Sequence, residues 1–214
     1  MIDLYTWTTP NGYKISIMLE ELGLPYNVIP VDLEALDQHK PEFTALNPNQ
    51  KIPAIVDHDT GAEPISVFES GAILIYLAEK TGQLLPAAPK ERAEVMQWLM
   101  YQMSHLGPIT GQAGHFANQA PKDQDHSYAL ERFVGETLRI LGVMNGRLAD
   151  RDYLAGDYSI ADIASYPWVV AAWGPLSALM PDEIAKLPHL ETWMKRLAKR
   201  PAVDKGMTVP AARD

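Results

Sequence analysis

The sequence predicts an α/β domain followed by an all-helical domain, and three observations support this prediction. The 214 residues are 47% hydrophobic and 21% charged, a balance typical of globular proteins with a sizeable core. Strand-like and helix-like segments alternate over residues 1–82, whereas only helical periodicity is found over residues 90–214. The segment 83–89 carries Pro86 and Pro89 among small residues, which is typical of an interdomain linker.

The first domain is expected to follow the order βαβ, then α, then ββα. The expected strands are residues 1–6, 26–31, 54–57 and 65–68, and the expected helices are 11–22, 40–46 and 70–80. The first helix has an apolar face and is followed by Gly23 and Pro25, the usual order of a C-terminal stop. Residues 58–61 predict a hairpin turn between the last two strands.

The second domain is expected to consist of helices alone. The expected helices are residues 91–107, 128–148, 159–173 and 190–199. Gly107 and Pro108 are expected to kink or end the first of these helices, and Pro201 to end the last. Ser159 and Asp162 have the spacing of a capping box, to which we assign a role in folding.

Charge and hydropathy exclude two classes of partner. The formal net charge of −9 argues against nucleic acid, whose binding depends on clustered Lys and Arg. The apolar run 161–172 is interrupted by polar residues and proline, and it is shorter than the roughly 20 residues that cross a bilayer. Met1 is not followed by a basic segment and an apolar one, so we expect a cytoplasmic protein without a membrane partner.

The absence of cysteine limits the chemistry. Without it the chain has no disulfide, no thiolate metal site and no thiol nucleophile of its own, which excludes a glutaredoxin-type enzyme. The six histidines show no ligand-like spacing, so no metal site is expected. Redox chemistry at sulfur therefore needs a thiol that arrives with a ligand.

Four motifs are found in order along the chain: YTWTTPNG at 5–12, NPNQKIPAI at 47–55, FESGAILIYL at 68–77 and YSIADIA at 158–164. In this order and spacing they resemble the glutathione transferase superfamily over essentially the whole chain. Within it they are most similar to the bacterial nu-class proteins, the glutathione-dependent disulfide-bond oxidoreductases. The resemblance implies a glutathione transferase fold, with a thioredoxin-like N-terminal domain and an all-α C-terminal bundle. It also implies a homodimer whose cofactor is glutathione, in the reduced or the disulfide form.

Thr9 and Asn11 lie between the first strand and the first helix, where free amide groups and a partial positive charge stabilise a nearby thiolate. The resemblance implies that both are catalytic, with the Thr9 hydroxyl and the Asn11 amide beside the glutathione sulfur. The alternative is that they form only a turn and a helix cap, which these residue types favour. Tyr5, inside the strand, is expected to pack in the core.

Ile52 and Pro53 resemble the cis-proline corner of thioredoxin-like domains. The trans preference before proline is only about 0.5–1 kcal/mol, and a cis bond would let the Ile52 backbone pair with the cysteinyl unit of glutathione. Lys51 would hold the glycyl carboxylate as a compact charge. Gln38 lies where the family has a polar contact to the same end. The alternative is a trans turn with an exposed lysine.

Glu69 and Ser70 suit the γ-glutamyl headgroup of glutathione. Ser70 begins a helix, where its hydroxyl and nearby amides bind a carboxylate, and Glu69 can pair with an ammonium group. The alternative is that Ser70 caps its own helix and Glu69 favours the helix dipole.

Arg132, in the second domain, matches a family arginine that reaches glutathione across the dimer interface. The alternative is a solvated arginine that pairs with Glu136, four residues on.

The function expected from this resemblance is that of a glutathione-dependent disulfide-bond oxidoreductase, which exchanges the thiol of bound glutathione with a small disulfide. One alternative is a glutathione transferase that conjugates glutathione to electrophilic small molecules, since the same activated thiolate serves both reactions. A second alternative is a non-catalytic glutathione-binding or assembly module, because fold alone does not determine function.

Overall fold

The computed structural model describes residues 1–211, and these form two compact units. The first unit comprises Met1–Pro86 and residues 197–211, and the second is Ala87–Arg196. The division after Pro86 falls within the segment 83–89 that the sequence analysis treats as a linker. The second division falls within helix α9 (Pro188–Ala198), so the end of the described chain belongs to the first unit, which the sequence does not predict.

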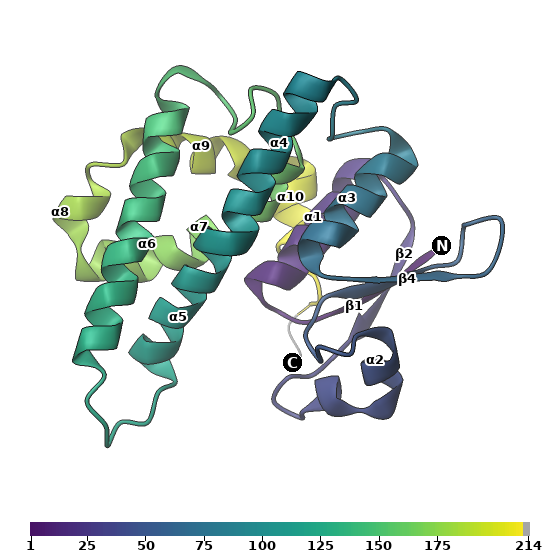
Figure 1. Ribbon diagram of the computed structural model, residues 1–214, viewed down its shortest axis with the longest axis horizontal. Coiled ribbons are helices and arrows are strands. Elements are labelled where there is room, and N and C mark those ends of the chain that lie inside the picture. Colours follow the sequence, from purple (N-terminus) through teal and green to yellow (C-terminus); the bar gives the residue numbers. More distant parts are fainter. Residues whose placement is uncertain (212–214) are drawn as a thin grey trace. The chain divides into compact units, whose positions relative to one another are not determined.

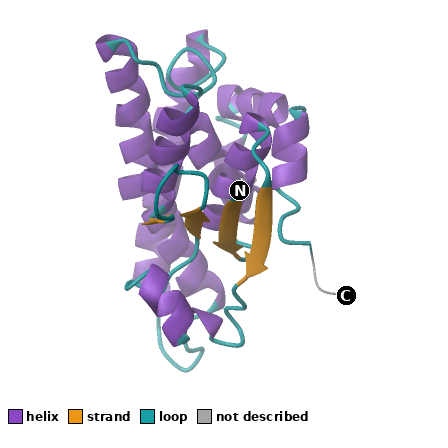
Figure 2. Cartoon of the chain, turned by 90° about the vertical axis from the view of Figure 1, so that its right-hand side faces the viewer, coloured by secondary structure: helices purple, strands orange, loops and turns teal. Residues whose placement is uncertain are grey.

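The first unit is built on a mixed sheet of four strands, as predicted. They are β1 (Ile2–Thr6), β2 (Tyr26–Pro30), β3 (Ala54–Asp57) and β4 (Ile65–Phe68). The order across the sheet is β2-β1-β3-β4, with β2 parallel to β1 and both other pairings antiparallel. Figure 2 shows strands of this sheet in orange. Parallel β1 and β2 need a crossover connection, which is the first helix.

This unit has five described helices, of which three were predicted and end at or within one residue of the expected position. They are α1 (Pro10–Leu22), the short 3₁₀ helix η1 (Asp37–His39), α2 (Pro41–Leu46), α3 (Ser70–Thr81) and α10 (Pro201–Gly206). α1 and α3 each end at a glycine in the left-handed conformation, Gly23 with φ 61° and Gly82 with φ 67°. The core between these two helices and the sheet is apolar and fully buried, and includes Leu4, Ile15, Met18, Ile55, Leu74 and Leu77.

Helix α10 packs on α1 at very short range (Figure 1). The buried Ser16 hydroxyl donates to the Gly206 carbonyl at 2.6 Å. A Cβ atom added to Gly206 would lie 2.6 Å from both the Cα and the backbone nitrogen of Ile17. Only glycine therefore allows this approach, because a backbone neighbour cannot rotate away.

We expect Gly206→Ala to lower the free energy of unfolding by about 1–3 kcal/mol, the usual cost of overpacking. Urea unfolding of both proteins measures this difference. Gly142→Ala is the matched control, since a Cβ atom there meets nothing within 4 Å. A Gly206→Ala protein as stable as the unchanged one would show that α10 does not need this contact.

The second unit is helical throughout, as predicted. Its helices are α4 (Pro89–Tyr101), the π-helical turn η2 (Gln102–Leu106), α5 (Gly107–Asn118), α6 (Ser127–Arg147), the 3₁₀ helix η3 (Leu148–Asp150), α7 (Ile160–Leu179), α8 (Pro181–Ile184) and most of α9. None of the described helices is both long enough and apolar enough to cross a membrane.

Helical structure extends beyond the prediction at several places. The chain does not leave the helical conformation at Gly107 and Pro108, but continues through η2 into α5. α7 runs past its expected end at residue 173 to Leu179, with Pro175 inside it. α9 ends at Ala198, before Pro201 as expected, but Pro201 then begins a further helix, α10, that was not predicted. Proline is tolerated in the first turn of a helix because its missing N–H would have no partner there.

The capping box that opens α7 is confirmed. The buried Asp162 carboxylate accepts hydrogen bonds from the backbone N–H groups of Ser159 (3.2 Å) and Leu154 (3.0 Å), and from Trp193 Nε1 (2.9 Å). Burial raises the pKa of Asp162 to about 6, although these hydrogen bonds act in the opposite direction. The box thus joins a helix start, a loop and α9 through one carboxyl group.

Candidate active site

The register of the sheet brings three of the motifs to one edge. Tyr5 at the end of β1 lies opposite Ala54 at the start of β3, and Ala54 lies opposite Phe68 at the end of β4. Thr9 and Asn11 follow β1, Ile52 and Pro53 precede β3, and Glu69 and Ser70 follow β4. Candidate residues that are up to 61 positions apart in the sequence therefore gather at the same end of three neighbouring strands.

Thr9 is the N-cap of α1, with extended backbone angles of φ −137° and ψ 157°. Its hydroxyl oxygen accepts a hydrogen bond from the Gly12 N–H at 3.2 Å. The cap uses the hydroxyl only as an acceptor, so its hydrogen can still be donated to a ligand atom. The capping and catalytic interpretations of Thr9 are therefore compatible. Asn11 lies in the first turn of α1 and is half-buried.

Gly12 holds the start of α1 close to the end of β1. A Cβ atom at this position would lie 2.4 Å from the Trp7 carbonyl oxygen and 2.4 Å from Thr6 Oγ1. Glycine thus permits the tight turn that places Thr9 and Asn11 at the sheet edge.

The peptide bond between Ile52 and Pro53 is cis, as expected. The buried Asn47 shapes the preceding turn, because its Nδ2 donates to the Lys51 carbonyl at 2.6 Å and its Oδ1 accepts from the Asn49 N–H at 2.9 Å. Ile52 is buried against Val31, Phe43 and Ala54, and the partly buried Tyr5 packs on the same cluster. Lys51 is exposed at the side of this corner.

Gln38, in η1, has a buried Oε1 atom with no hydrogen-bond partner among the described residues. Its Nε2 lies 3.4 Å from His39 Nε2, and His39 Nδ1 lies 2.7 Å from Gln50 Oε1. A buried acceptor without a partner costs free energy, which a ligand donor would recover. This atom suits a polar contact to a bound peptide. His39 and Gln50, which were not predicted as site residues, orient the Gln38 side chain through these contacts.

Glu69 and Ser70 stand at the start of α3 with unequal exposure. Glu69 is exposed and is the residue before the helix, held at φ 69°, a left-handed conformation that is uncommon outside glycine. Ser70 is buried and is the first helical residue. Glu69, not Ser70, occupies the cap position, and it forms no side-chain cap bond. Ser70 is therefore not the N-cap residue of α3.

A residue that the sequence analysis missed joins α1 to this turn. Lys14 is 1% exposed, and its Nζ donates to Ser70 Oγ at 3.2 Å. Burial lowers the pKa of Lys14 to about 7, while the charge of Glu69 acts to raise it. The only signal in the sequence is a lysine beside the apolar face of α1.

Arg132 is exposed on α6, in the second unit. The alternative pairing with Glu136 is not formed, because Glu136 binds Arg139 at 2.6 Å. The charge of Arg132 still acts with Arg139 to lower the pKa of Glu136, with the Arg139 hydrogen bond as the larger cause.

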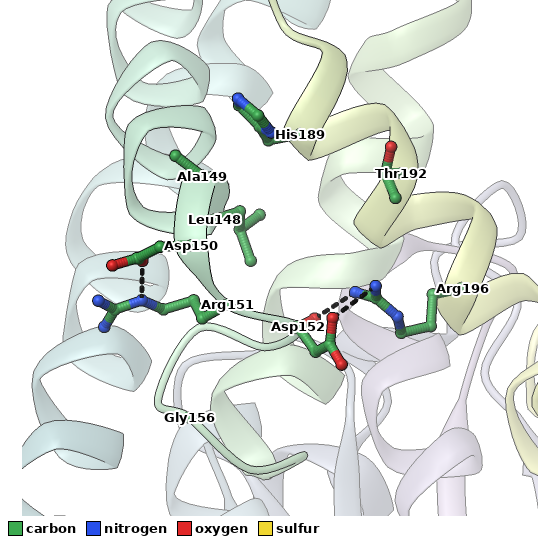
Figure 3. A pocket seen from close by; sticks show the side chains of 9 residues that line it. All are labelled: Leu148, Ala149, Asp150, Arg151, Asp152, Gly156, His189, Thr192 and Arg196. Carbon is green, nitrogen blue, oxygen red and sulfur yellow. Dashed lines mark hydrogen bonds and ion pairs between the residues drawn. The ribbon is translucent and has the colours of Figure 1, made fainter.

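A pocket of about 560 Å³ in the second unit contains none of the candidate residues (Figure 3). The charged side chains that line the pocket form ion pairs with one another. Arg151 binds Asp150 at 2.8 Å and Arg196 binds Asp152 at 2.6 Å. The described part of the chain also has no group of three or more His, Asp or Glu side chains placed to hold a metal ion.

Comparison with known proteins identifies the family. The model of the glutathione S-transferase N-terminal domain matches residues 1–79, and that of the C-terminal domain matches residues 95–201. The chain belongs to the glutathione S-transferase family. Its first unit is accordingly the thioredoxin-like part of this fold, and the helical part follows it.

Individual family members are similar over nearly the full length. The disulfide-bond oxidoreductase YfcG of Escherichia coli is 49% identical over 210 residues, which cover 97% of this chain and 94% of that protein. A glutathione transferase of Burkholderia graminis, crystallised with two glutathione molecules per subunit, has a TM-score of 0.93 and 46% identity, covering 99% of this chain and 89% of that one. One of Pseudomonas putida, with one glutathione disulfide bound per subunit, also has a TM-score of 0.93, with 43% identity over 98% of this chain and 91% of that one.

Proposed function

We propose that this family member is a glutathione-dependent disulfide-bond oxidoreductase. The observation that carries the proposal is the sheet edge, where Thr9, the Ile52–Pro53 corner and the Glu69–Ser70 turn meet in a chain without cysteine. The Thr9 hydroxyl at this edge can donate a hydrogen bond to a thiol, but the protein has no thiol of its own, so the ligand must supply it. The disulfide-bond oxidoreductase activity named for YfcG supports the same conclusion.

Each residue has a place in this proposal. Glu69 pairs with the ammonium group and Ser70 with the carboxylate of the γ-glutamyl headgroup, and the Ile52 backbone pairs with the cysteinyl unit. The glycyl carboxylate is met by Lys51 and Gln38. Thr9 donates its hydroxyl to the sulfur, and Asn11 its side-chain amide, at the positive end of the α1 dipole.

The reaction is thiol–disulfide exchange, in which glutathione is a substrate. Its thiolate attacks one sulfur of a small disulfide, the S–S bond breaks, and the first product thiolate leaves and takes up a proton. A second glutathione thiolate attacks the resulting mixed disulfide at its glutathione sulfur. This step releases the second thiol and forms glutathione disulfide. Two glutathione thiols are oxidised and one disulfide is reduced, so no other oxidant is needed.

Conjugation of glutathione to an electrophilic carbon is the second candidate. The glutathione transferases of Burkholderia graminis and Pseudomonas putida favour it by name, and the same thiolate would serve it. We further propose, on the family resemblance, a cytoplasmic homodimer in which Arg132 reaches the partner's glutathione.

The test compares initial rates with glutathione and hydroxyethyl disulfide against rates with glutathione and a chlorinated aromatic acceptor. We expect turnover of the disulfide well above the uncatalysed rate and slower turnover of the acceptor. Turnover of the acceptor alone would replace the proposal by conjugation. Activity on neither, with no retention on immobilised glutathione, would indicate a non-catalytic module.

A further inference from the structure

Lys14 is buried beside the Glu69–Ser70 turn, where the proposed function places the γ-glutamyl headgroup of glutathione. It lies on the second turn of α1, and its Nζ contacts Ser70 Oγ at the start of the twelve-residue helix α3. Burying an ammonium group is costly unless hydrogen bonds and charges compensate it. The hydrogen bond of Lys14 to Ser70 joins α1 to the turn at which the proposed function places the γ-glutamyl headgroup.

We propose that Lys14 is a positioning residue that fixes the Ser70 hydroxyl as a donor to the carboxylate of the γ-glutamyl headgroup. The inference rests on the proposed function, because glutathione supplies that carboxylate. Lys14 orients the ligand donor through its hydrogen bond to the Ser70 hydroxyl, and its charge also interacts with the bound carboxylate.

The reason lies in the donors and acceptors of the two side chains. An ammonium group has three donors and no acceptor, so a protonated Lys14 can only donate to Ser70 Oγ. The hydroxyl hydrogen must then be donated to another group. A neutral amine has a lone pair and can accept that hydrogen, which would turn the hydroxyl away from the ligand. The protonated state of Lys14 therefore selects the binding-competent orientation of Ser70.

This arrangement couples binding to a proton. Burial lowers the pKa of Lys14 to about 7, with Glu69 raising it, so above neutral pH much of the free protein holds a neutral Lys14. A bound carboxylate next to Ser70 adds negative charge and raises this pKa. Binding above pH 7 should thus take up a proton.

Other charged groups lie on the elements that pack on α1. The elements that pack on α1 carry these charged groups: Glu79 and Lys80 on α3, Asp204 and Lys205 on α10, and Asp3 on β1. Lys80 pairs with Asp57 at 2.7 Å and Lys205 with Glu20 at 2.8 Å. Asp3 is held by Asn27 and His58. The charge of Glu69 acts to raise the pKa of Lys14.

The test is titration calorimetry of S-methylglutathione at pH 8 in phosphate and in Tris, whose ionisation enthalpies differ. S-methylation removes the thiol, whose own ionisation would obscure the result. We expect an uptake of about 0.5 to 1 proton per site by the unchanged protein, as linkage requires. Lys14→Met should abolish this uptake and weaken binding about tenfold, the size of one hydrogen bond to a charged group.

Two controls separate positioning from structure. Lys205→Met removes an exposed lysine of the same unit and should leave the proton uptake unchanged. The S-methyl peptide that lacks the γ-glutamyl carboxylate should bind the unchanged protein without proton uptake, a readout that does not depend on the folding of any variant.

Equal proton uptake with and without the ligand carboxylate would overturn the inference, as would equal uptake by the unchanged protein and a folded Lys14→Met protein. An unchanged protein that binds S-methylglutathione without taking up a proton also contradicts it, while leaving the proposed function intact. Absence of any binding to the unchanged protein would overturn the proposed function, and this inference with it.

Discussion

Replacing Thr9 by alanine is expected to lower kcat/KM for hydroxyethyl disulfide by about 100-fold, while most of the stability is kept. The activity falls because a preorganised donor to the reacting sulfur is lost. The stability falls by about 1 kcal/mol because the side chain also caps α1 through the Gly12 N–H. Initial rates and urea unfolding of the same preparations measure the two effects.

The conservative variant decides between the two roles of this hydroxyl. Thr9→Ser keeps both the cap and the donor and should retain most of the activity. Ser159→Ala is the control for a lost cap, because Ser159 caps α7 in the second unit and has no assigned role in catalysis. Unchanged turnover by Thr9→Ala would remove Thr9 from the mechanism and leave it a helix cap.

Replacing Asp162 by alanine is expected to lower the free energy of unfolding by about 3 kcal/mol or more. The substitution leaves three donors without their acceptor, the N–H groups of Leu154 and Ser159 and the indole of Trp193, which is fully buried. Each buried donor left unsatisfied costs about 1–3 kcal/mol. Urea unfolding at pH 7 measures the loss, and a decrease below 1 kcal/mol would contradict the central role of this carboxyl group.

The pH dependence of stability gives an independent check on Asp162. Its folded pKa of about 6 lies above the ordinary value of 3.8, so the folded protein gains additional stability from binding a proton at Asp162, and this pH-dependent contribution is complete below about pH 3.8. That contribution is lost as the pH rises through 6. Asp162→Asn cannot titrate, so its unfolding free energy should change less between pH 4 and 7 than that of the unchanged protein. Parallel curves for the two proteins would refute the assignment.

Local signals in the sequence account for the strands and for most helix ends of the first unit. Gly23 and Gly82 stop helices by adopting a backbone conformation that few other residues accept, and such a preference is visible in the sequence. The Gly107-Pro108 pair carries an equally strong local signal, but the chain remains helical there. Pro108 falls in the first turn of α5, where it removes no hydrogen bond.

The candidate site could be predicted as far as its residues belong to motifs. The cis bond at Pro53 and the turn of Glu69 and Ser70 lie within such stretches. Lys14 could not be predicted, because its burial depends on α1 and α3 packing together from positions 56 residues apart. A lysine in a helix is usually solvated, and only tertiary structure reveals the exception.

The packing of α10 on α1 has a consequence for how the protein is made. Ser16 and Gly206 are 190 positions apart, and the bidentate pair between Arg200 and Glu21 joins the same distant segments. A chain that leaves the ribosome from its N-terminus can form the sheet early, yet the surface of α1 around Ile17 stays uncovered until α10 emerges. The unit that carries the candidate site is thus started first, and it is completed only after the whole of the second unit has been synthesised.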